Sequence, residues 1–196
     1  PTANTAYTLT VTNPSGVATT QNAQVNVYPA VTTDTVALTT NALTLGQSVT
    51  FTANYAGGVV SVTPNTGVVL TTNNGVATVT LTPNATTVYN YVVTNPAGTA
   101  NIQTLPISVY AAPTANALTA SIANITLGQS VSFTPNFANG TATITPSIGA
   151  VVSGNTYTDI PSTTTTYSLV VTNLAGTSVT KNALVNVYAA PTTPGS

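Results

Sequence analysis

One ten-residue segment occurs three times along this chain. Tyr7-Thr-Leu-Thr-Val-Thr-Asn-Pro-Ser-Gly16 returns as Tyr89-Asn-Tyr-Val-Val-Thr-Asn-Pro-Ala-Gly98 and as Tyr167-Ser-Leu-Val-Val-Thr-Asn-Leu-Ala-Gly176. The spacings are 82 residues (89 − 7) and 78 residues (167 − 89). A fixed period of this kind is typical of a tandem array of structural units. The repeat therefore predicts several copies of one small domain.

Each copy has the hydrophobic pattern of β-strands. Val131 and Phe133 alternate with polar residues, as Val49 and Phe51 do in the preceding copy, and this period of two marks strands with one buried face. Gly46 and Gly128 stand where a tight turn needs a positive φ. No helical period appears, and the abundant Thr and Val suit pleated strands. The pattern predicts an all-β chain of antiparallel β-sandwiches, about seven short strands in each.

Three equivalent tyrosines begin the penultimate strand of each copy: Tyr7, Tyr89 and Tyr167. Each follows a polar corner, which is Thr163 to Thr166 in the last copy. This is the place of the tyrosine corner in immunoglobulin-like sandwiches, where the hydroxyl is tied back to the chain. We expect the three tyrosines to serve that structural role.

Three segments carry a family resemblance: Ile125-Thr-Leu-Gly-Gln-Ser-Val131, Pro146-Ser-Ile-Gly-Ala-Val151 and Thr164-Thr-Thr-Tyr-Ser-Leu-Val-Val-Thr-Asn-Leu-Ala-Gly-Thr177. They resemble bacterial immunoglobulin-like repeats, and the resemblance covers nearly the whole chain. It implies tandem immunoglobulin-like domains of a large cell-surface or secreted protein, in which such modules mostly act as spacers. The junctions lack acidic residues, so calcium-stiffened linkers are not expected.

The repeats divide the chain at short connections that contain proline, beginning after Tyr28, Tyr110 and Tyr188. Such connections favour stiff, extended linkers over flexible ones. The predicted segments are 1–28, the last two strands of an immunoglobulin-like repeat; 29–110 and 111–188, two full domains; and 189–196, a linker or the start of a next repeat.

The first segment is only part of a domain. Residues 1–28 align without a gap with residues 161–188 and are identical at 15 of 28 positions. An isolated two-stranded hairpin is marginally stable in water, so we expect five further strands to complete it. They could come from an upstream part of a longer polypeptide, which the sequence favours, or from a neighbouring subunit that exchanges strands.

The near absence of charge excludes many functions. The 196 residues include one Lys or Arg, two Asp or Glu, and no His or Cys. General acid–base catalysis needs titratable pairs and metal sites need clustered ligands, while nucleic-acid binding needs many cations. The composition therefore predicts a non-enzymatic protein with no cofactor, no metal and no nucleic-acid partner. No segment reaches the 18 apolar residues of a membrane span.

A surface with so few charges has little electrostatic protection against association. This favours a chain whose main partner is itself, although a neutral surface kept soluble by hydroxyls, amides and glycans is the alternative. Sequons for N-glycosylation occur at Asn84, Asn124 and Asn139. Asp159 and Lys181 lie in one repeat, but a carboxylate-assisted Lys–Asn crosslink is the weaker interpretation of this pair.

Taken together, these patterns predict a structural, non-enzymatic subunit or segment of an extracellular or cell-surface filament built from immunoglobulin-like repeats. The alternative is the spacer stalk of a large cell-surface adhesin whose ligand-binding head lies elsewhere. An accessory region of a secreted hydrolase is a third and weaker hypothesis.

Overall fold

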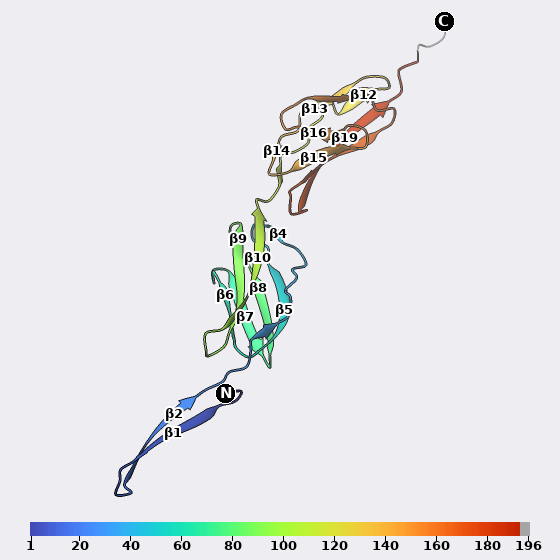
Figure 1. Cartoon of the computed structure of the whole chain (residues 1–196). Helices are drawn as coiled ribbons and strands as arrows, with labels where there is room; N and C mark the ends of the chain where they lie inside the picture. Colours follow the sequence, from blue (N-terminus) through green and yellow to red (C-terminus); the bar gives the residue numbers. More distant parts are fainter. Residues whose placement is uncertain (193–196) are drawn as a thin grey trace. The chain divides into compact units, whose positions relative to one another are not determined.

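The computed structural model describes residues 1–192, and all the regular structure in this range is β-strand (Figure 1). The chain divides into two compact units. Unit 1 contains Pro1–Leu38, Thr50–Leu81 and Tyr89–Leu105, and unit 2 contains Thr39–Val49, Thr82–Val88 and the chain from Pro106 onward. Among the described residues there is no helix of the length and hydrophobicity that crossing a membrane requires. The all-β prediction is confirmed.

The first two strands form a hairpin on their own, drawn in blue in Figure 1. β1 (Thr5–Thr12) pairs with β2 (Ala18–Val25) in antiparallel register, with Tyr7 opposite Ala23. Gly16 closes the turn with φ +89°, a conformation that glycine adopts without strain. Within residues 1–192 no other strand joins this sheet, and Leu9 on β1 is 64% exposed.

Residues 29–110 contain eight strands: β3 (Thr32–Thr33), β4 (Ala42–Thr44), β5 (Val49–Ala56), β6 (Val59–Thr63), β7 (Val68–Asn73), β8 (Val76–Leu81), β9 (Thr87–Thr94) and β10 (Ala100–Tyr110). They form two four-stranded sheets in the orders β3-β5-β8-β7 and β4-β10-β9-β6. Every second residue of β8 and β9 is buried, as the alternating pattern predicts. In unit 1 the rings of Phe51 and Tyr91 pack edge to face with centroids 5.8 Å apart.

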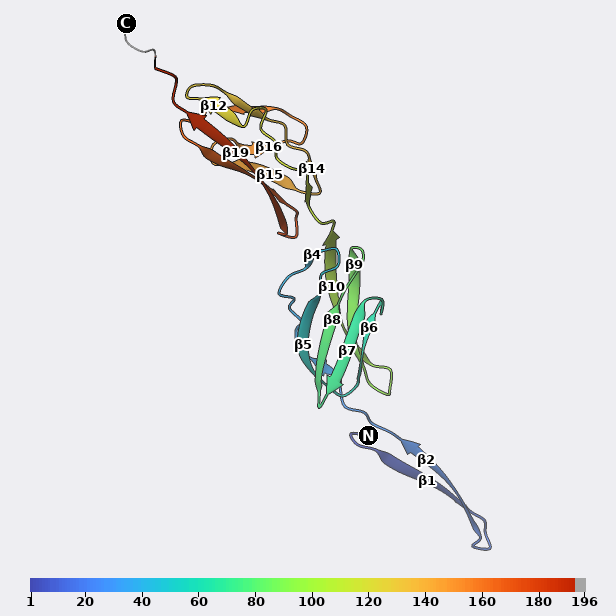
Figure 2. The same cartoon turned by 180° about the vertical axis from the view of Figure 1, so that it is seen from behind.

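Residues 111–188 contain nine strands: β11 (Thr114–Ala115), β12 (Asn124–Thr126), β13 (Val131–Phe133), β14 (Phe137–Ala138), β15 (Thr141–Thr145), β16 (Gly149–Val151), β17 (Tyr157–Asp159), β18 (Thr165–Thr172) and β19 (Ser178–Tyr188). The main sheet has the order β12-β19-β18-β15-β16, and β13 pairs with β17. Four strands of the main sheet, β12, β19, β15 and β16, are labelled in Figure 2. Between them lies one core that joins Val131 and Phe133 of β13 to Tyr167, Leu169 and Val171 of β18. Along β18 these three buried residues alternate with half-buried ones.

Three features of the sheets differ from a plain repetition of one antiparallel unit. The short strands β4 and β12 pair in parallel with the ends of β10 and β19. Pro135 occupies the position of Ala53 and has no N–H to donate, so the single strand β5 corresponds to two strands, β13 and β14. In addition, β7 pairs with β8, whereas the corresponding β16 pairs with β15.

Candidate functional site

The turn of each repeated hairpin is organised by an asparagine: Asn13, Asn95 or Asn173. In each case the side-chain oxygen Oδ1 accepts hydrogen bonds of 2.9–3.1 Å from the backbone N–H groups of the second and fourth residues that follow. An asparagine that bonds to its own backbone in this way mimics a backbone turn. The three tips therefore have the same local structure, and each leaves the Nδ2 amide group directed away from its own turn.

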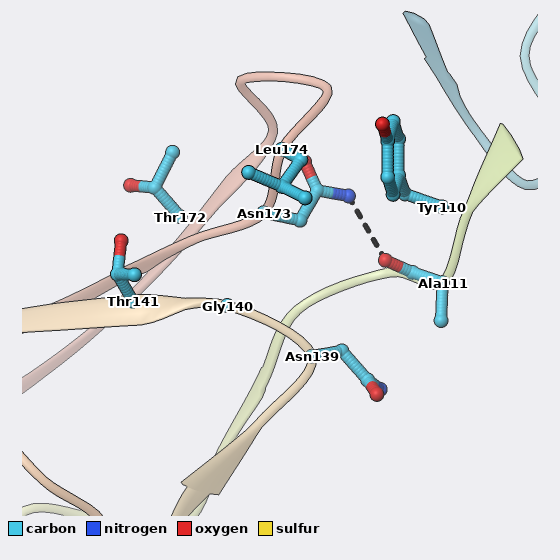
Figure 3. Close-up of a pocket in the computed structure, with 8 residues that line it drawn as sticks. All are labelled: Tyr110, Ala111, Asn139, Gly140, Thr141, Thr172, Asn173 and Leu174. Atoms are coloured by element: carbon cyan, nitrogen blue, oxygen red, sulfur yellow. Dashed lines mark hydrogen bonds between the residues drawn. The ribbon is translucent and has the colours of Figure 1, made fainter. Parts of the chain in front are cut away.

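In the second and third hairpins this Nδ2 group binds the backbone of the irregular segment that precedes β3 or β11. Asn95 donates to the carbonyl of Pro29 at 3.1 Å in unit 1, and Asn173 donates to the carbonyl of Ala111 at 2.9 Å in unit 2 (Figure 3). Each bond fixes an irregular linker to a regular hairpin. Because a buried amide must find partners, these bonds explain why Asn95 and Asn173 tolerate near-complete burial.

Asn173 makes one more contact within unit 2. Its Nδ2 group also donates to Thr44 Oγ1 at 2.9 Å, and the Thr44 and Thr177 hydroxyls lie 2.6 Å apart. Thr44 is only 5% exposed and Asn173 6%. The tip of the β18–β19 hairpin and the end of β4 thus form a small, buried polar cluster in which each side chain has a hydrogen-bond partner.

Beside this cluster is a hollow of about 460 Å³. It is lined by Tyr110, Ala111, Asn139, Gly140, Thr141, Thr172, Asn173 and Leu174 (Figure 3). A Cβ atom at Gly140 would lie 2.5 Å from the carbonyl oxygen of Thr172, so only glycine permits the backbones to approach this closely. The lining contains no Asp, Glu, His, Lys or Arg, and it offers apolar surface together with the Tyr110 phenol and hydroxyl and amide hydrogen-bonding groups.

The three tyrosines predicted as corners have different surroundings. The Tyr89 hydroxyl donates to the backbone carbonyl of Thr66 at 3.1 Å, and the Tyr167 hydroxyl donates to the Asp159 carboxylate at 2.5 Å. Both rings are buried, whereas Tyr7 is 51% exposed on the β1–β2 hairpin. The shared structural role therefore remains a prediction. For Tyr7 it requires that another segment pack over the ring, because the β1–β2 sheet alone leaves it exposed.

Asp159 is the centre of a hydroxyl cluster. The Ser147 hydroxyl donates to its carboxylate, as do the Tyr167 hydroxyl and the backbone N–H of Ile160. The hydrogen bonds from Ser147 and then Tyr167 hold the pKa of Asp159 below its usual value of 3.8. Burial, followed by the neighbouring Asp159 carboxylate, raises the pKa of Tyr167 to about 12. The cluster stabilises the charged form of one carboxylate and the neutral form of one phenol.

Lys181 is separate from these described partners of Asp159. It lies on β19 opposite Leu169 of β18, and it is partly exposed. The partners of the Asp159 carboxylate are the two hydroxyls and the backbone N–H. The arrangement is that of a structural hydrogen-bond network, and the Lys–Asn crosslink stays an untested hypothesis.

The three predicted glycosylation asparagines are all exposed. Asn124 Oδ1 accepts a hydrogen bond of 2.8 Å from Asn186, and Asn139 Nδ2 donates to the carbonyl of Ala112 at 3.1 Å. A glycan attaches at Nδ2 in place of one of its two hydrogens, so a modified Asn139 could keep this bond only through the one N–H that remains. Asn84 lies in the segment that precedes β9. Within residues 1–192 no group of three or more His, Cys, Asp or Glu residues could hold a metal ion.

The contact between Asn173 and Thr44 escaped the sequence analysis. Both motifs that form the contact recur in the sequence. Thr-Asn is found in all three hairpin tips, and Thr-Leu-Gly-Gln is found at 44–47 and again at 126–129. What the sequence does not show is that one motif binds the other. That requires the positions of two segments more than a hundred residues apart.

Comparison with known proteins supports the fold. No family model matches the chain, and no curated protein matches it. Among solved structures, extracellular domains 3–5 of Drosophila OTK match 94% of this chain and 71% of theirs, with 13% identity and TM-score 0.56. The N-terminal eight immunoglobulin domains of Down Syndrome Cell Adhesion Molecule match 96% of this chain but only 28% of theirs, with 16% identity and TM-score 0.55. The titin I-band fragment I67–I69 matches 83% of this chain and 67% of its own, with 14% identity and TM-score 0.51. The immunoglobulin-like sandwich fold is therefore confirmed.

Proposed function

We propose that this chain is a structural, non-enzymatic segment of an extracellular filament and that its main partner is itself. The observation that carries the proposal is an apolar strand face without cover. Tyr7, Leu9 and Val11 of the β1–β2 hairpin are more than half exposed, whereas the equivalent Tyr167, Leu169 and Val171 are fully buried. A face of this composition gains free energy when another surface covers it.

The charge distribution supports association. The sequence contains two acidic residues and one basic residue, and Asp159 is engaged by hydrogen bonds within its own domain. Exposed hydrophobic side chains are also found on other strands and turns, among them Val59, Val69 and Leu174. Such a surface has almost no like-charge repulsion to keep copies apart.

The same observations support a role without catalysis. The hollow beside Asn173 contains no carboxylate, imidazole or amine side chain, and the Asp159 cluster contains a carboxylate whose lowered pKa makes it a poor proton donor or acceptor at neutral pH. We assign both to structure. The proposal also includes a location outside the cell. It further includes glycans on three exposed asparagines: Asn84, Asn124 and Asn139.

A second candidate is the spacer stalk of a cell-surface adhesin. It is favoured by similarity to chains described as extracellular domains and as a cell adhesion molecule, although this similarity is at the level of fold. A stalk needs stable sandwiches but no contact between copies. The two functions therefore differ in whether the purified chain associates.

Sedimentation velocity over a wide range of protein concentration tests the proposal. We expect the weight-average sedimentation coefficient to rise with concentration and to change little between low and high salt, because apolar contacts are not screened. A single monomeric species at every concentration would favour the stalk.

A further inference from the structure

The end of β4 forms a receptor for a hairpin tip within unit 2. The Thr44 backbone N–H donates to Gln47 Oε1 at 2.8 Å, and the Leu45 N–H donates to the Tyr110 carbonyl at 2.8 Å. Gly46 then turns the chain with φ +91°. These bonds hold the Thr44 hydroxyl in place, where it accepts from Asn173 and meets Thr177.

The chain carries a second turn of the same construction at the end of β12. The Thr126 N–H donates to Gln129 Oε1 at 2.7 Å, and the Leu127 N–H donates to the Tyr188 carbonyl at 2.8 Å. Gly128 again has φ +91°. The difference between the two turns lies in the threonine: Thr44 is buried and Thr126 is not, whereas Leu45 and Leu127 are about equally exposed at 55% and 56%. We call residues 126–129 the receptor turn.

The chain also carries an exposed hairpin tip, residues 13–17. Asn13 Oδ1 accepts from the N–H groups of Ser15 and Val17 at 3.0 and 2.9 Å, as Asn173 does within its own turn. Every residue of this tip is exposed. Val17 stands where the docked tip has Thr177, so the tip retains the amide donor and replaces one hydroxyl with an apolar group.

We propose that residues 13–17 of one copy dock on the receptor turn of a second copy of this chain. In this contact the Asn13 amide donates to Thr126 Oγ1 and to the carbonyl of Ala189, the counterparts of Thr44 and Ala111, and Val17, the counterpart of Thr177, packs against Thr126. The two surfaces are different patches of the chain, so the contact is heterologous. A heterologous contact that does not close into a ring extends without limit, which deepens the proposed filament function and rests on it.

Engineered cysteines test this contact directly, because the chain has no native cysteine. In unit 2 the Thr44 and Thr177 hydroxyls are 2.6 Å apart, so sulfur atoms at these two positions in T44C/T177C should be close enough to form a disulfide within one chain. The matched intermolecular pair is V17C/T126C. The negative control is T20C/T126C, because Thr20 is exposed on β2 but lies away from the tip.

After mild oxidation, we expect V17C/T126C to give a ladder of dimers, trimers and longer covalent chains on a non-reducing gel. A mixture of the V17C and T126C single variants should give the heterodimer in excess of either homodimer, and T20C/T126C should give at least tenfold less product. If T44C/T177C closes while V17C/T126C stays monomeric, or if T20C/T126C forms an equal ladder, the docking proposal is overturned. Concentration-dependent sedimentation in the same sample would then retain the self-associating function and reject this contact alone.

Discussion

The side-chain amide of Asn173 donates a hydrogen bond of 2.9 Å to the hydroxyl of Thr44, 129 residues earlier in the chain. The same amide donates to the carbonyl of Ala111, while the Asn173 oxygen organises its own turn. The side chain of Asn173 thus provides hydrogen bonds to its own turn, to the linker at Ala111 and to the end of β4. The asparagine of the repeated Thr-Asn pair therefore does more than form a turn, because in two of the three hairpins it also binds the backbone of another segment.

Replacing Asn173 with alanine should lower the free energy of unfolding by about 2–3 kcal/mol, because the change removes several buried hydrogen bonds and leaves Ala111 and Thr44 with lost partners. Asn13 is the matched control, since it makes the same turn bonds in an exposed setting. The N13A change should cost about 1 kcal/mol or less. Urea unfolding of the two variants measures the difference, and equal costs would show that the linker and Thr44 bonds contribute nothing.

Leu169 and Leu9 occupy equivalent positions in their hairpins but have opposite environments, fully buried and 64% exposed. The L169A change should destabilise the protein by about 2–5 kcal/mol through lost burial and a cavity. The L9A change should alter the stability of the dilute monomer by less than about 0.5 kcal/mol. Thermal or urea unfolding at low concentration is the measurement. A large cost for L9A in a monomeric sample would mean that the hairpin face is already covered within the chain.

Gly140 is required for close backbone contact, not for an unusual φ. A Cβ atom there would meet the Thr172 carbonyl oxygen at 2.5 Å, so the G140A change should cost about 3 kcal/mol from overpacking. Gly149 offers the converse case, with φ +84° and nothing within 4 Å of a built Cβ. The G149A change should cost about 1 kcal/mol from backbone strain alone. Calorimetric unfolding would contradict this account if G149A were the more damaging change.

The Asp159 cluster predicts a dependence of stability on acid pH. The folded-state pKa of Asp159 lies below the ordinary 3.8 because Ser147 and Tyr167 donate to the carboxylate. The stability that these bonds contribute is therefore fully present above about pH 4. It is lost as the pH falls through the lower folded-state pKa. Unfolding free energies measured from pH 5 to pH 2 should fall more steeply for the wild type than for D159N, and parallel curves would contradict this assignment.

The sequence predicts those features that depend on local pattern. The alternation of Tyr167, Leu169 and Val171, and the positive φ of Gly46 and Gly128, follow from side-chain period and turn chemistry. Features that depend on long-range pairing were not foreseen. They include the parallel pairing of β12 with β19 and the different partners of β7 and β16, because edge pairing is decided by which neighbour offers backbone groups and not by hydrophobic period.

The candidate site shows the same division. The Asn173 turn follows from the Asn-x-x-Gly sequence, but the Nδ2 bonds to Ala111 and Thr44 depend on tertiary structure. Likewise, the position of Tyr167 in its strand is visible in the sequence, whereas its bond to Asp159 instead of a backbone carbonyl is not. The second hydrogen-bond partner of such a side chain is set by the tertiary structure and not by the neighbouring sequence.

We propose above that this chain assembles with copies of itself through uncharged surface. Negative-stain electron microscopy of the purified chain at high concentration tests it most directly. The account predicts filaments of uniform width that persist in high salt and shorten when both Leu9 and Val11 are replaced by serine. Isolated particles at every concentration, in the wild type as well as in the variant, would contradict it.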